Sequence, residues 1–217
     1  TPLLPQVKET LKELFGEEYG NPSSPYETGR RARDLLEESR HRLAELLGAK
    51  PSELIFTSGG SEGNNMVLRQ LLFREDPGHL LVSSVEHPSV LETAKWLTRK
   101  NNLSLGILPV DQSGKVPVAS MEAAVQPETC LISVMAANNE TGTVQPFREL
   151  AGIARERQVP FHSDCVQYAG KCELNLESSG LNYATLTAHK LGGPKGIGLL
   201  YIREGSPFSP LITGGGQ

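Results

Sequence analysis

Short apolar runs alternate with helix-like stretches along most of the chain, and this alternation is the strongest constraint on its fold. Strand-like runs occupy residues 54–57, 80–85, 103–110, 130–136, 159–163, 183–186 and 199–202. Helical patterns between them are expected at 65–73, 89–100, 119–125 and 147–157. Strands that alternate with helices are typical of parallel βαβ units. The sequence therefore predicts an α/β fold with a mainly parallel, doubly wound sheet.

The N-terminal quarter reads as two further helices joined by a loop. A helix is expected at 6–15, a loop at 16–25, and a long charged helix at 26–47 that ends at Gly48. The leucines expected on its buried stripe are Leu35, Leu36, Leu43, Leu46 and Leu47. No internal repeat or linker interrupts the pattern, so residues 1–217 are expected to form one domain.

Composition and charge exclude several classes of function. The 217 residues carry a net charge of −4, which gives no electrostatic reason to expect a nucleic-acid or membrane partner. Apolar runs such as 131–137 are far too short to cross a bilayer, and no secretory signal is visible at the start. Three cysteines, Cys130, Cys165 and Cys172, lack paired metal spacing, so we expect reduced cytoplasmic thiols and no metal site.

Polar clusters follow five of the expected strands. They lie at residues 58–61, 86–87, 138–139, 164–167 and 187–190. Ligands of a doubly wound sheet bind beyond the carboxyl ends of its strands, so we expect these clusters to converge on one pocket.

Lys190 is the residue in these clusters with the most chemistry to offer. A deprotonated lysine amine forms a Schiff base with an aldehyde, but an isolated His-Lys pair before a turn is more often a surface feature. Gly60 and Ser61 could bind a phosphate at a helix start or simply cap the helix. Asp164 could keep a pyridine nitrogen protonated or cap a turn.

Three more side chains could either contact a cofactor or have only a local structural role. His87 could stack on a flat cofactor and move protons, or serve as a structural histidine. Asn139 and Gln167 could hydrogen-bond a phenolic oxygen or satisfy turn backbone. Local sequence alone leaves each choice open.

As an ordered set, these motifs resemble a known family. Residues 58–62, 86–87, 138–142, 164–171 and 187–198 are similar to the motifs of the cysteine desulfurase branch of the class V (fold type I) PLP-dependent aminotransferases, which includes selenocysteine lyase. The resemblance covers residues 1–217 in family order. It implies that the chain is the large PLP-binding domain of such an enzyme.

The resemblance also implies a role for each candidate residue. Lys190 would form the Schiff base with pyridoxal 5'-phosphate (PLP), and His87 would stack on the cofactor ring and shuttle protons. Asp164 would pair with the pyridine nitrogen and Gln167 with the phenolic oxygen. Asn139 would lie near the substrate and the cofactor oxygen. The phosphate would be held by Gly60, Ser61, Thr187 and His189.

The activity implied by the resemblance is release of sulfur from L-cysteine, giving L-alanine and an enzyme persulfide for sulfur metabolism such as iron–sulfur cluster assembly. A homodimer is implied as well. Selenocysteine lyase and another class V aminotransferase remain alternatives, and a non-catalytic scaffold of the same fold is a more distant one.

The sequence departs from the family pattern at several positions, among them Gly63 and the end of the chain. Gly63 stands where serine is common, with no consequence that the sequence reveals. The chain ends at 214–217, where the family continues into a smaller domain with a mobile catalytic cysteine and an arginine for the substrate carboxylate. We therefore expect a fragment in which none of the three cysteines is the nucleophile. Side chains alternate along a strand, so Cys165 should face away from a pocket that Asp164 and Val166 face.

Overall fold

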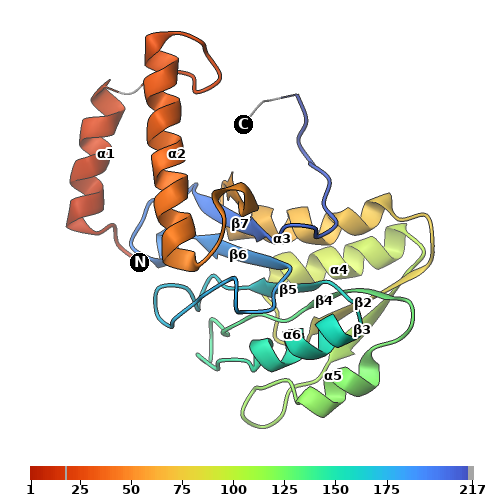
Figure 1. Ribbon diagram of the computed structural model, residues 1–217. Helices are drawn as coiled ribbons and strands as arrows, with labels where there is room; N and C mark the ends of the chain where they lie inside the picture. The colour runs from red at the N-terminus through yellow and green to blue at the C-terminus, as the bar shows by residue number, and fades with distance from the viewer. Residues whose placement is uncertain (18, 215–217) are drawn as a thin grey trace.

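One mixed sheet organises the computed structural model, which describes residues 1–17 and 19–214. Its strand order is β1-β7-β6-β5-β4-β2-β3 (Figure 1). The strands are β1 (Leu54–Thr57), β2 (Gly78–Ser83), β3 (Leu103–Leu108), β4 (Thr129–Ser133), β5 (Phe161–Asp164), β6 (Tyr183–Thr187) and β7 (Gly198–Ile202). The pairs from β6 through β3 are parallel, whereas β7 is antiparallel to both β6 and β1. The predicted α/β class with a mainly parallel sheet is confirmed.

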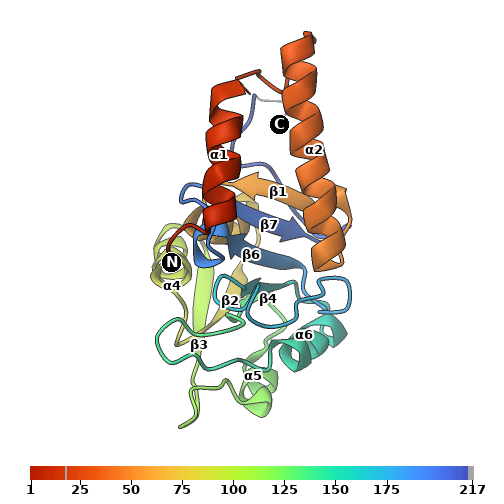
Figure 2. The ribbon, with the colours of Figure 1, turned by 90° about the vertical axis from the view of Figure 1, so that its left-hand side faces the viewer.

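Two pairs of helices cover the two faces of this sheet (Figure 2). Helices α3 (Gly60–Leu68) and α4 (Pro88–Lys100), which lie side by side in Figure 1, pack on one face, and α5 (Val118–Ala124) and α6 (Phe147–Glu156) pack on the other. A buried apolar cluster lies under each pair: Val67 and Leu97 belong to the first, Met121 and Leu150 to the second. Burial of these side chains stabilises the layers by about 1.5–3 kcal/mol for each large residue.

Helices α1 (Pro5–Glu17) and α2 (Glu27–Leu47) project beyond the β1 edge of the sheet (Figures 1 and 2). The expected buried stripe of α2 is therefore only partly correct. Leu43 and Leu47 pack against the core, but Leu35 and Leu46 are 37% and 79% exposed. Leu35 is exposed because its part of α2 lies beyond the edge of the sheet, whereas Leu46 lies in the last turn, on the side of the helix that faces away from the core. Gly48 ends the helix as predicted, with a left-handed φ of 60° that glycine adopts at little cost.

The start of α3 differs from the sequence-based expectation. The helix begins at Gly60, five residues before the predicted position 65, and continues into a short 3-10 helix, η2 (Arg69–Phe73). Gly59, with φ of 155° and ψ of −177°, provides the sharp turn from β1 into the helix, a conformation closed to other residues. The two other short 3-10 helices in the described residues are η1 (Pro51–Glu53) and η3 (Ala188–Lys190).

The connections of β2 create a crevice at the carboxyl ends of the strands. From β2 the chain passes through α4 to β3 on one side, then returns through α5 to β4 on the other side of β2. The loops after β2 and β4 therefore diverge. Such a switch point is where open α/β sheets bind ligands.

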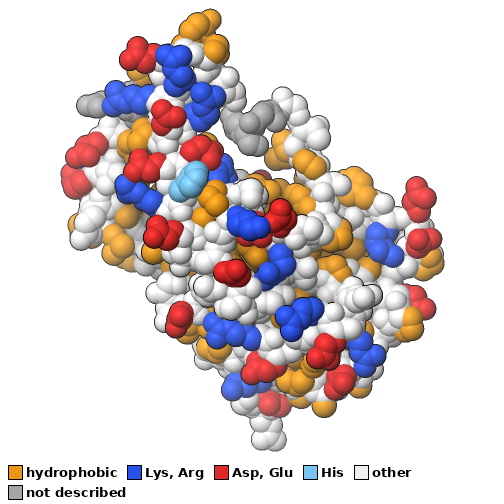
Figure 3. Space-filling view, viewed as in Figure 1, with side chains coloured by type: hydrophobic (Ala, Val, Ile, Leu, Met, Phe, Trp, Pro, Cys, Tyr) orange, Lys and Arg blue, Asp and Glu red, His pale blue; other side chains and the backbone are white. Residues whose placement is uncertain are grey.

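Charged side chains are interspersed over the face of the molecule seen in Figure 3. Lysine and arginine alternate with aspartate and glutamate there, with no large field of one sign. Within the described ranges 1–17 and 19–214, no helix is long and apolar enough to cross a membrane.

The close contact between α3 and β6 explains why glycine stands at position 63. A Cβ added to Gly63 would lie 2.8 Å from Cγ2 of Thr185, which is fully buried and whose Oγ1 lies 3.1 Å from His162 Nε2. We expect Gly63→Ser to lower the free energy of unfolding by about 1–3 kcal/mol because the core is overpacked. Urea denaturation measures the loss.

Thr185→Ser supplies the matched compensating change, because it keeps the hydroxyl and removes the methyl group. The double variant Gly63→Ser/Thr185→Ser should be more stable than the sum of the two single effects predicts. A Gly63→Ser protein as stable as the parent would contradict this account of the contact.

Candidate functional site

A cavity of about 310 Å³ opens at the switch point. Its lining includes all nine cofactor-binding residues predicted from the sequence: Gly60, Ser61, His87, Asn139, Asp164, Gln167, Thr187, His189 and Lys190. Residues far apart in the chain meet here because they follow β1, β2, β4, β5 and β6. The floor, formed by Asp164 and Asn64, is buried, whereas His87 and Asn139 on the rim are exposed.

Lys190 reaches the cavity from η3, directly after β6. The strand is completely buried, so it fixes the starting point of this short turn. Thr187 Oγ1 donates to the carbonyl oxygen of Ile197 at 3.2 Å and lies 2.9 Å from Nδ1 of His189. Desolvation, followed by the nearby cations of Lys190 and Lys195, lowers the pKa of His189. The motif around Lys190 is thus held by its own hydrogen bonds.

The N-terminus of α3 forms one wall of the cavity. The first N–H groups of an α-helix have no partner within the helix, and they carry the positive end of its dipole. Gly60 and Ser61 occupy this first turn and line the cavity. Glu62 turns away, because its Oε2 accepts a hydrogen bond from the backbone N–H of Ser58 at 2.6 Å. The free N–H groups and the Ser61 hydroxyl therefore suit a phosphate.

Asp164 ends β5 at the bottom of the cavity and is only 5% exposed. Its Oδ2 accepts a hydrogen bond from Asn64 Nδ2 at 2.7 Å, and its Oδ1 accepts one from the backbone N–H of Val166 at 3.0 Å. Desolvation raises the pKa of Asp164, although both hydrogen bonds oppose the shift. A buried carboxylate in such a site favours a positively charged partner.

His87 forms the opposite rim at the N-terminus of α4. Its Nδ1 accepts a hydrogen bond from the backbone N–H of Ser89 at 3.1 Å, so the ring caps the helix. Ser89 Oγ lies 2.7 Å from the same nitrogen. The imidazole is therefore held over the cavity by its helix.

The amide side chains of Gln167 and Asn139, both predicted from the sequence, line the cavity, whereas that of Asn138 does not. Gln167 Oε1 accepts a hydrogen bond from Lys171 Nζ at 2.6 Å, which leaves the Gln167 NH₂ group to face the cavity. Asn139 lines the cavity, whereas Asn138 Oδ1 accepts from the backbone N–H groups of Glu140 and Thr141. Asn138 therefore takes the structural interpretation, as a residue that caps its own turn.

Sequence reasoning missed three residues that line the cavity: Asn64, Ser89 and Met135. Asn64 lies one helical turn after Gly60, so a correct start for α3 would have identified it.

Sequence reasoning also missed the role of Glu86. This buried carboxyl accepts two hydrogen bonds at Oε1, from Ser83 Oγ at 2.6 Å and from the Met135 N–H at 2.7 Å. Glu86 thereby ties the loop after β2 to the loop after β4.

The donor set fits PLP. Asn64 Oδ1 is buried with no hydrogen-bond partner among the described residues, and it belongs to the side chain that holds Asp164. A protonated ring nitrogen has one hydrogen, which the buried carboxylate of Asp164 would accept, and its positive charge also suits an unpaired acceptor beside that carboxylate. A lysine, an anion-binding helix N-terminus and an exposed imidazole complete a site for a flat, phosphorylated aldehyde.

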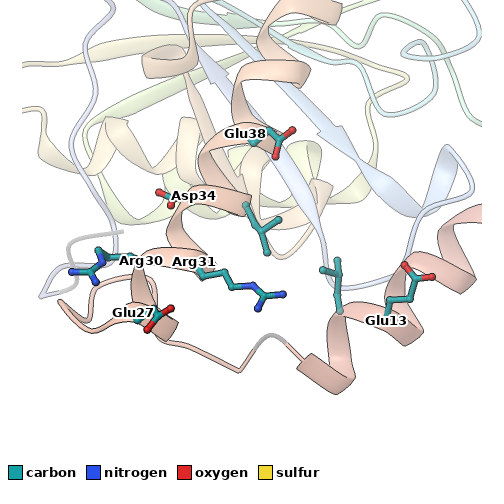
Figure 4. A pocket seen from close by; sticks show the side chains of 8 residues that line it. Glu13, Glu27, Arg30, Arg31, Asp34 and Glu38 are labelled. Atoms are coloured by element: carbon teal, nitrogen blue, oxygen red, sulfur yellow. The ribbon is translucent and has the colours of Figure 1, made fainter.

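A second hollow lies between α1 and α2 and has a different character (Figure 4). Glu13 projects from α1, and Glu27, Arg30, Asp34 and Glu38 project from α2. Charges of both signs on two exposed helices are typical of a solvated surface. This hollow is separate from the cavity that holds Lys190.

The cysteines lie outside the cavity lining. Cys165 is fully buried and faces the core, while Asp164 and Val166 on either side of it line the cavity, as the strand alternation predicts. Burial raises the pKa of the Cys165 thiol to about 12. Cys130 is half-buried and Cys172 is exposed. Within the described part of the chain, no group of three or more His, Cys, Asp or Glu side chains could hold a metal ion.

Known proteins are similar to this chain over its whole length. The family model described as aminotransferase class-V matches residues 1–217. The chain is 43% identical over 219 residues to cysteine desulfurase IscS of Dictyoglomus turgidum, with 100% of this chain and 55% of that protein aligned. It is 36% identical over 222 residues to the mitochondrial cysteine desulfurase of Saccharomyces cerevisiae, with 100% of this chain and 44% of that protein aligned.

Solved structures are likewise similar to this chain over its whole length. A NifS-like protein superposes with a TM-score of 0.96 at 39% identity, covering 100% of this chain and 60% of that one. SspA in complex with cysteine superposes with a TM-score of 0.96 at 38% identity, covering 100% and 63%. The chain spans about half the length of the curated relatives it matches.

Glu86 should make stability depend on pH. Burial raises the pKa of Glu86 from 4.5 to about 8, so the folded protein keeps a proton that the unfolded chain releases. Stability from this group is therefore complete below about pH 4.5 and is lost as the pH rises through about 8. Glu86→Gln should remove this dependence, and urea denaturation from pH 5 to 8 measures it for both proteins. Parallel pH profiles for the two would contradict a protonated Glu86.

The three thiols should differ strongly in reactivity. Alkylation requires an accessible thiolate, so we expect iodoacetamide to modify exposed Cys172 readily at pH 8 and to leave Cys165 unmodified in the folded protein. Mass spectrometry of tryptic peptides measures both, and urea-unfolded protein provides the control in which all three react. Modification of folded Cys165 at the rate of Cys172 would show that its burial is wrong.

Proposed function

The chain belongs to the class V aminotransferase family, and from that premise we propose that it is the PLP-binding domain of a cysteine desulfurase. The proposed enzyme converts L-cysteine to L-alanine and passes the sulfur to an enzyme thiol as a persulfide. The observation that carries the proposal is the meeting of Lys190, Asp164 and His87 in one cavity. Similarity over the whole chain to proteins named cysteine desulfurase supports this choice within the family.

PLP would supply an aldehyde that links to amino groups and a ring that accepts electrons from the substrate. Lys190 would bind it covalently through its amine. The carboxylate of Asp164 would hold the proton on the ring nitrogen, since a positive partner relieves the desolvation that raises its pKa. The N–H groups of α3, with Ser61, Thr187 and His189, would bind the phosphate.

The remaining polar side chains would handle protons and orientation at the open side. The NH₂ group of Gln167 would donate to the phenolic oxygen, and Asn139 would lie beside that oxygen and the substrate. His87 would stack on the ring and move a proton between substrate and solvent, which its exposed position at the rim permits. Lys190 and His87 are thus the two catalytic residues of this proposal.

The thiol that accepts sulfur is proposed to be none of Cys130, Cys165 and Cys172. A nucleophilic cysteine needs access and a lowered pKa. Cys165 is buried with a raised pKa, burial likewise raises the pKa of Cys130, and the exposed Cys172 does not line the cavity.

The proposed substrate has support from a structural neighbour, SspA, whose structure is a complex with cysteine. We further propose a homodimer that works in the cytoplasm on cysteine or, as the alternative, selenocysteine.

The test compares the full-length gene product, purified with PLP, with its Lys190→Ala variant. We expect visible absorbance from bound PLP, and a pyridoxyl group on Lys190 after borohydride reduction. With L-cysteine and a thiol reductant, the parent should form alanine and sulfide, and Lys190→Ala should lose at least about a hundredfold of that rate. Lys195→Ala is the matched control, because Lys195 is an exposed lysine on the same loop outside the cavity lining.

Other outcomes separate the alternatives. A keto acid with the amine form of the cofactor would identify an aminotransferase. A preference for selenocysteine would identify the lyase. Bound PLP that turns over no amino acid would leave a scaffold, and absence of PLP binding would overturn the proposal.

A further inference from the structure

A hydrogen-bonded bridge joins Asp164 to His87 through two side chains that the proposed function does not use. Asn64 Nδ2 donates to Asp164 Oδ2 at 2.7 Å and to Ser89 Oγ at 2.9 Å. Ser89 Oγ in turn lies 2.7 Å from His87 Nδ1. The bridge thus runs from the end of β5, across α3, to the first turn of α4.

The donors along this bridge point in one direction. An amide NH₂ group can only donate, so both of its hydrogens are committed to Asp164 and Ser89. Ser89 Oγ therefore accepts from Asn64, and its own hydrogen is available for His87 Nδ1. The lone pair of that nitrogen is the acceptor at the end of the bridge.

The backbone supports the same assignment independently. The Ser89 N–H donates to His87 Nδ1 at 3.1 Å, and a backbone N–H cannot accept a hydrogen bond. Two donors therefore converge on Nδ1, which must present its lone pair. The single proton of the neutral imidazole then belongs on Nε2.

We propose that Asn64 and Ser89 are positioning residues, which hold His87 in the Nε2–H tautomer and fix its ring relative to Asp164. The tautomer follows from the hydrogen bonds of this chain alone. Its effect on catalysis rests on the proposed function, in which His87 moves protons and Asp164 faces the ring nitrogen.

Burial makes the bridge effective at its inner end. Asn64 is 1% exposed and Asp164 5% exposed, so the hydrogen bond between them is largely shielded from water. Hydrogen bonds in such a site hold their geometry, and loss of one partner leaves a buried group unpaired. His87 is exposed, so its orientation depends on the two bonds to Nδ1.

Nitrogen NMR of the chain labelled with ¹⁵N-histidine tests the tautomer without PLP. The chain has five histidines, and the signal that disappears in His87→Gln identifies the one of interest. We expect a protonated Nε2 and an unprotonated Nδ1 in the parent. In Ser89→Ala the Nδ1 signal should shift and the Nδ1–H tautomer should become detectable, while Ser89→Thr should restore the parent spectrum.

A matched control is available one turn along α4. Thr93 Oγ1 donates to Asn65 Oδ1 at 3.2 Å, which links the same two helices without touching Asp164 or His87. Thr93→Val should leave the His87 signals unchanged. Equal changes in Ser89→Ala and Thr93→Val would reduce the bridge to general packing and overturn the proposal. A parent His87 with its proton on Nδ1 would overturn it too.

Kinetics of the full-length enzyme with PLP provide the second readout. Ser89→Ala should lower kcat about tenfold and displace its pH profile, with KM for L-cysteine changed less than about twofold, because the variant disturbs orientation and not substrate binding. Unchanged kcat and pH profile would overturn the positioning role. If the NMR result holds while no PLP is bound, the proposed function fails and the tautomer assignment stands.

Discussion

Backbone hydrogen bonds between parallel strands are the constraint on which the site depends. The register of β6, β5, β4 and β2 brings four carboxyl ends to one edge, and β1 delivers α3 to the same edge by pairing with β7. Strands β2, β5 and β6 are buried along their whole length, and a slip of one residue would exchange the side chains packed in the two apolar clusters on the opposite faces of the sheet. A fixed register also fixes the positions of the side chains that follow these strands.

Burial keeps two ionisable side chains near the cavity, His162 and Glu86, in their neutral forms. His162 precedes Asp164 by two residues on β5, with Nδ1 2.8 Å from Ser133 Oγ and Nε2 3.1 Å from Thr185 Oγ1. Burial lowers the pKa of His162 to about 3 and raises the pKa of Glu86, so both are neutral near pH 7. Neutral neighbours avoid the cost of several buried charges. The carboxyl of Asp164 is the one of these groups that lines the cavity.

The sequence predicted the elements of this fold better than their mutual packing. Residues 54–57 were predicted as a strand with the bounds that β1 has, because its short apolar run is bounded by turn residues. The exposure of Leu35 could not be predicted, since helical periodicity shows which side chains share a face but not whether the sheet extends beneath that part of the helix. The start of α3 depended on the backbone of Gly59, which composition does not reveal.

The candidate site was predictable to the extent that strand ends alone determine it. Lys190, Asp164 and His87 each follow a strand, so topology brings them together. Asn64 and Ser89 lie inside helices, and their significance comes from a contact between α3 and α4 that no local pattern encodes. Glu86 was hidden for a similar reason, because its partner is the backbone of Met135, 49 residues away in sequence.

His87 caps α4, and in the proposed function it would also carry protons. The lone pair on Nδ1 is the cap of α4, so a proton placed there would cost the helix its first-turn hydrogen bond and would disturb the segment that carries Ser89. In the proposed function, proton transfer would therefore be confined to Nε2, and the folding of a thirteen-residue helix would select the reactive edge of the ring. Asparagine at this position could cap the helix but has no ring to carry a proton. Helix stability and the proposed chemistry therefore place two different requirements on the same side chain.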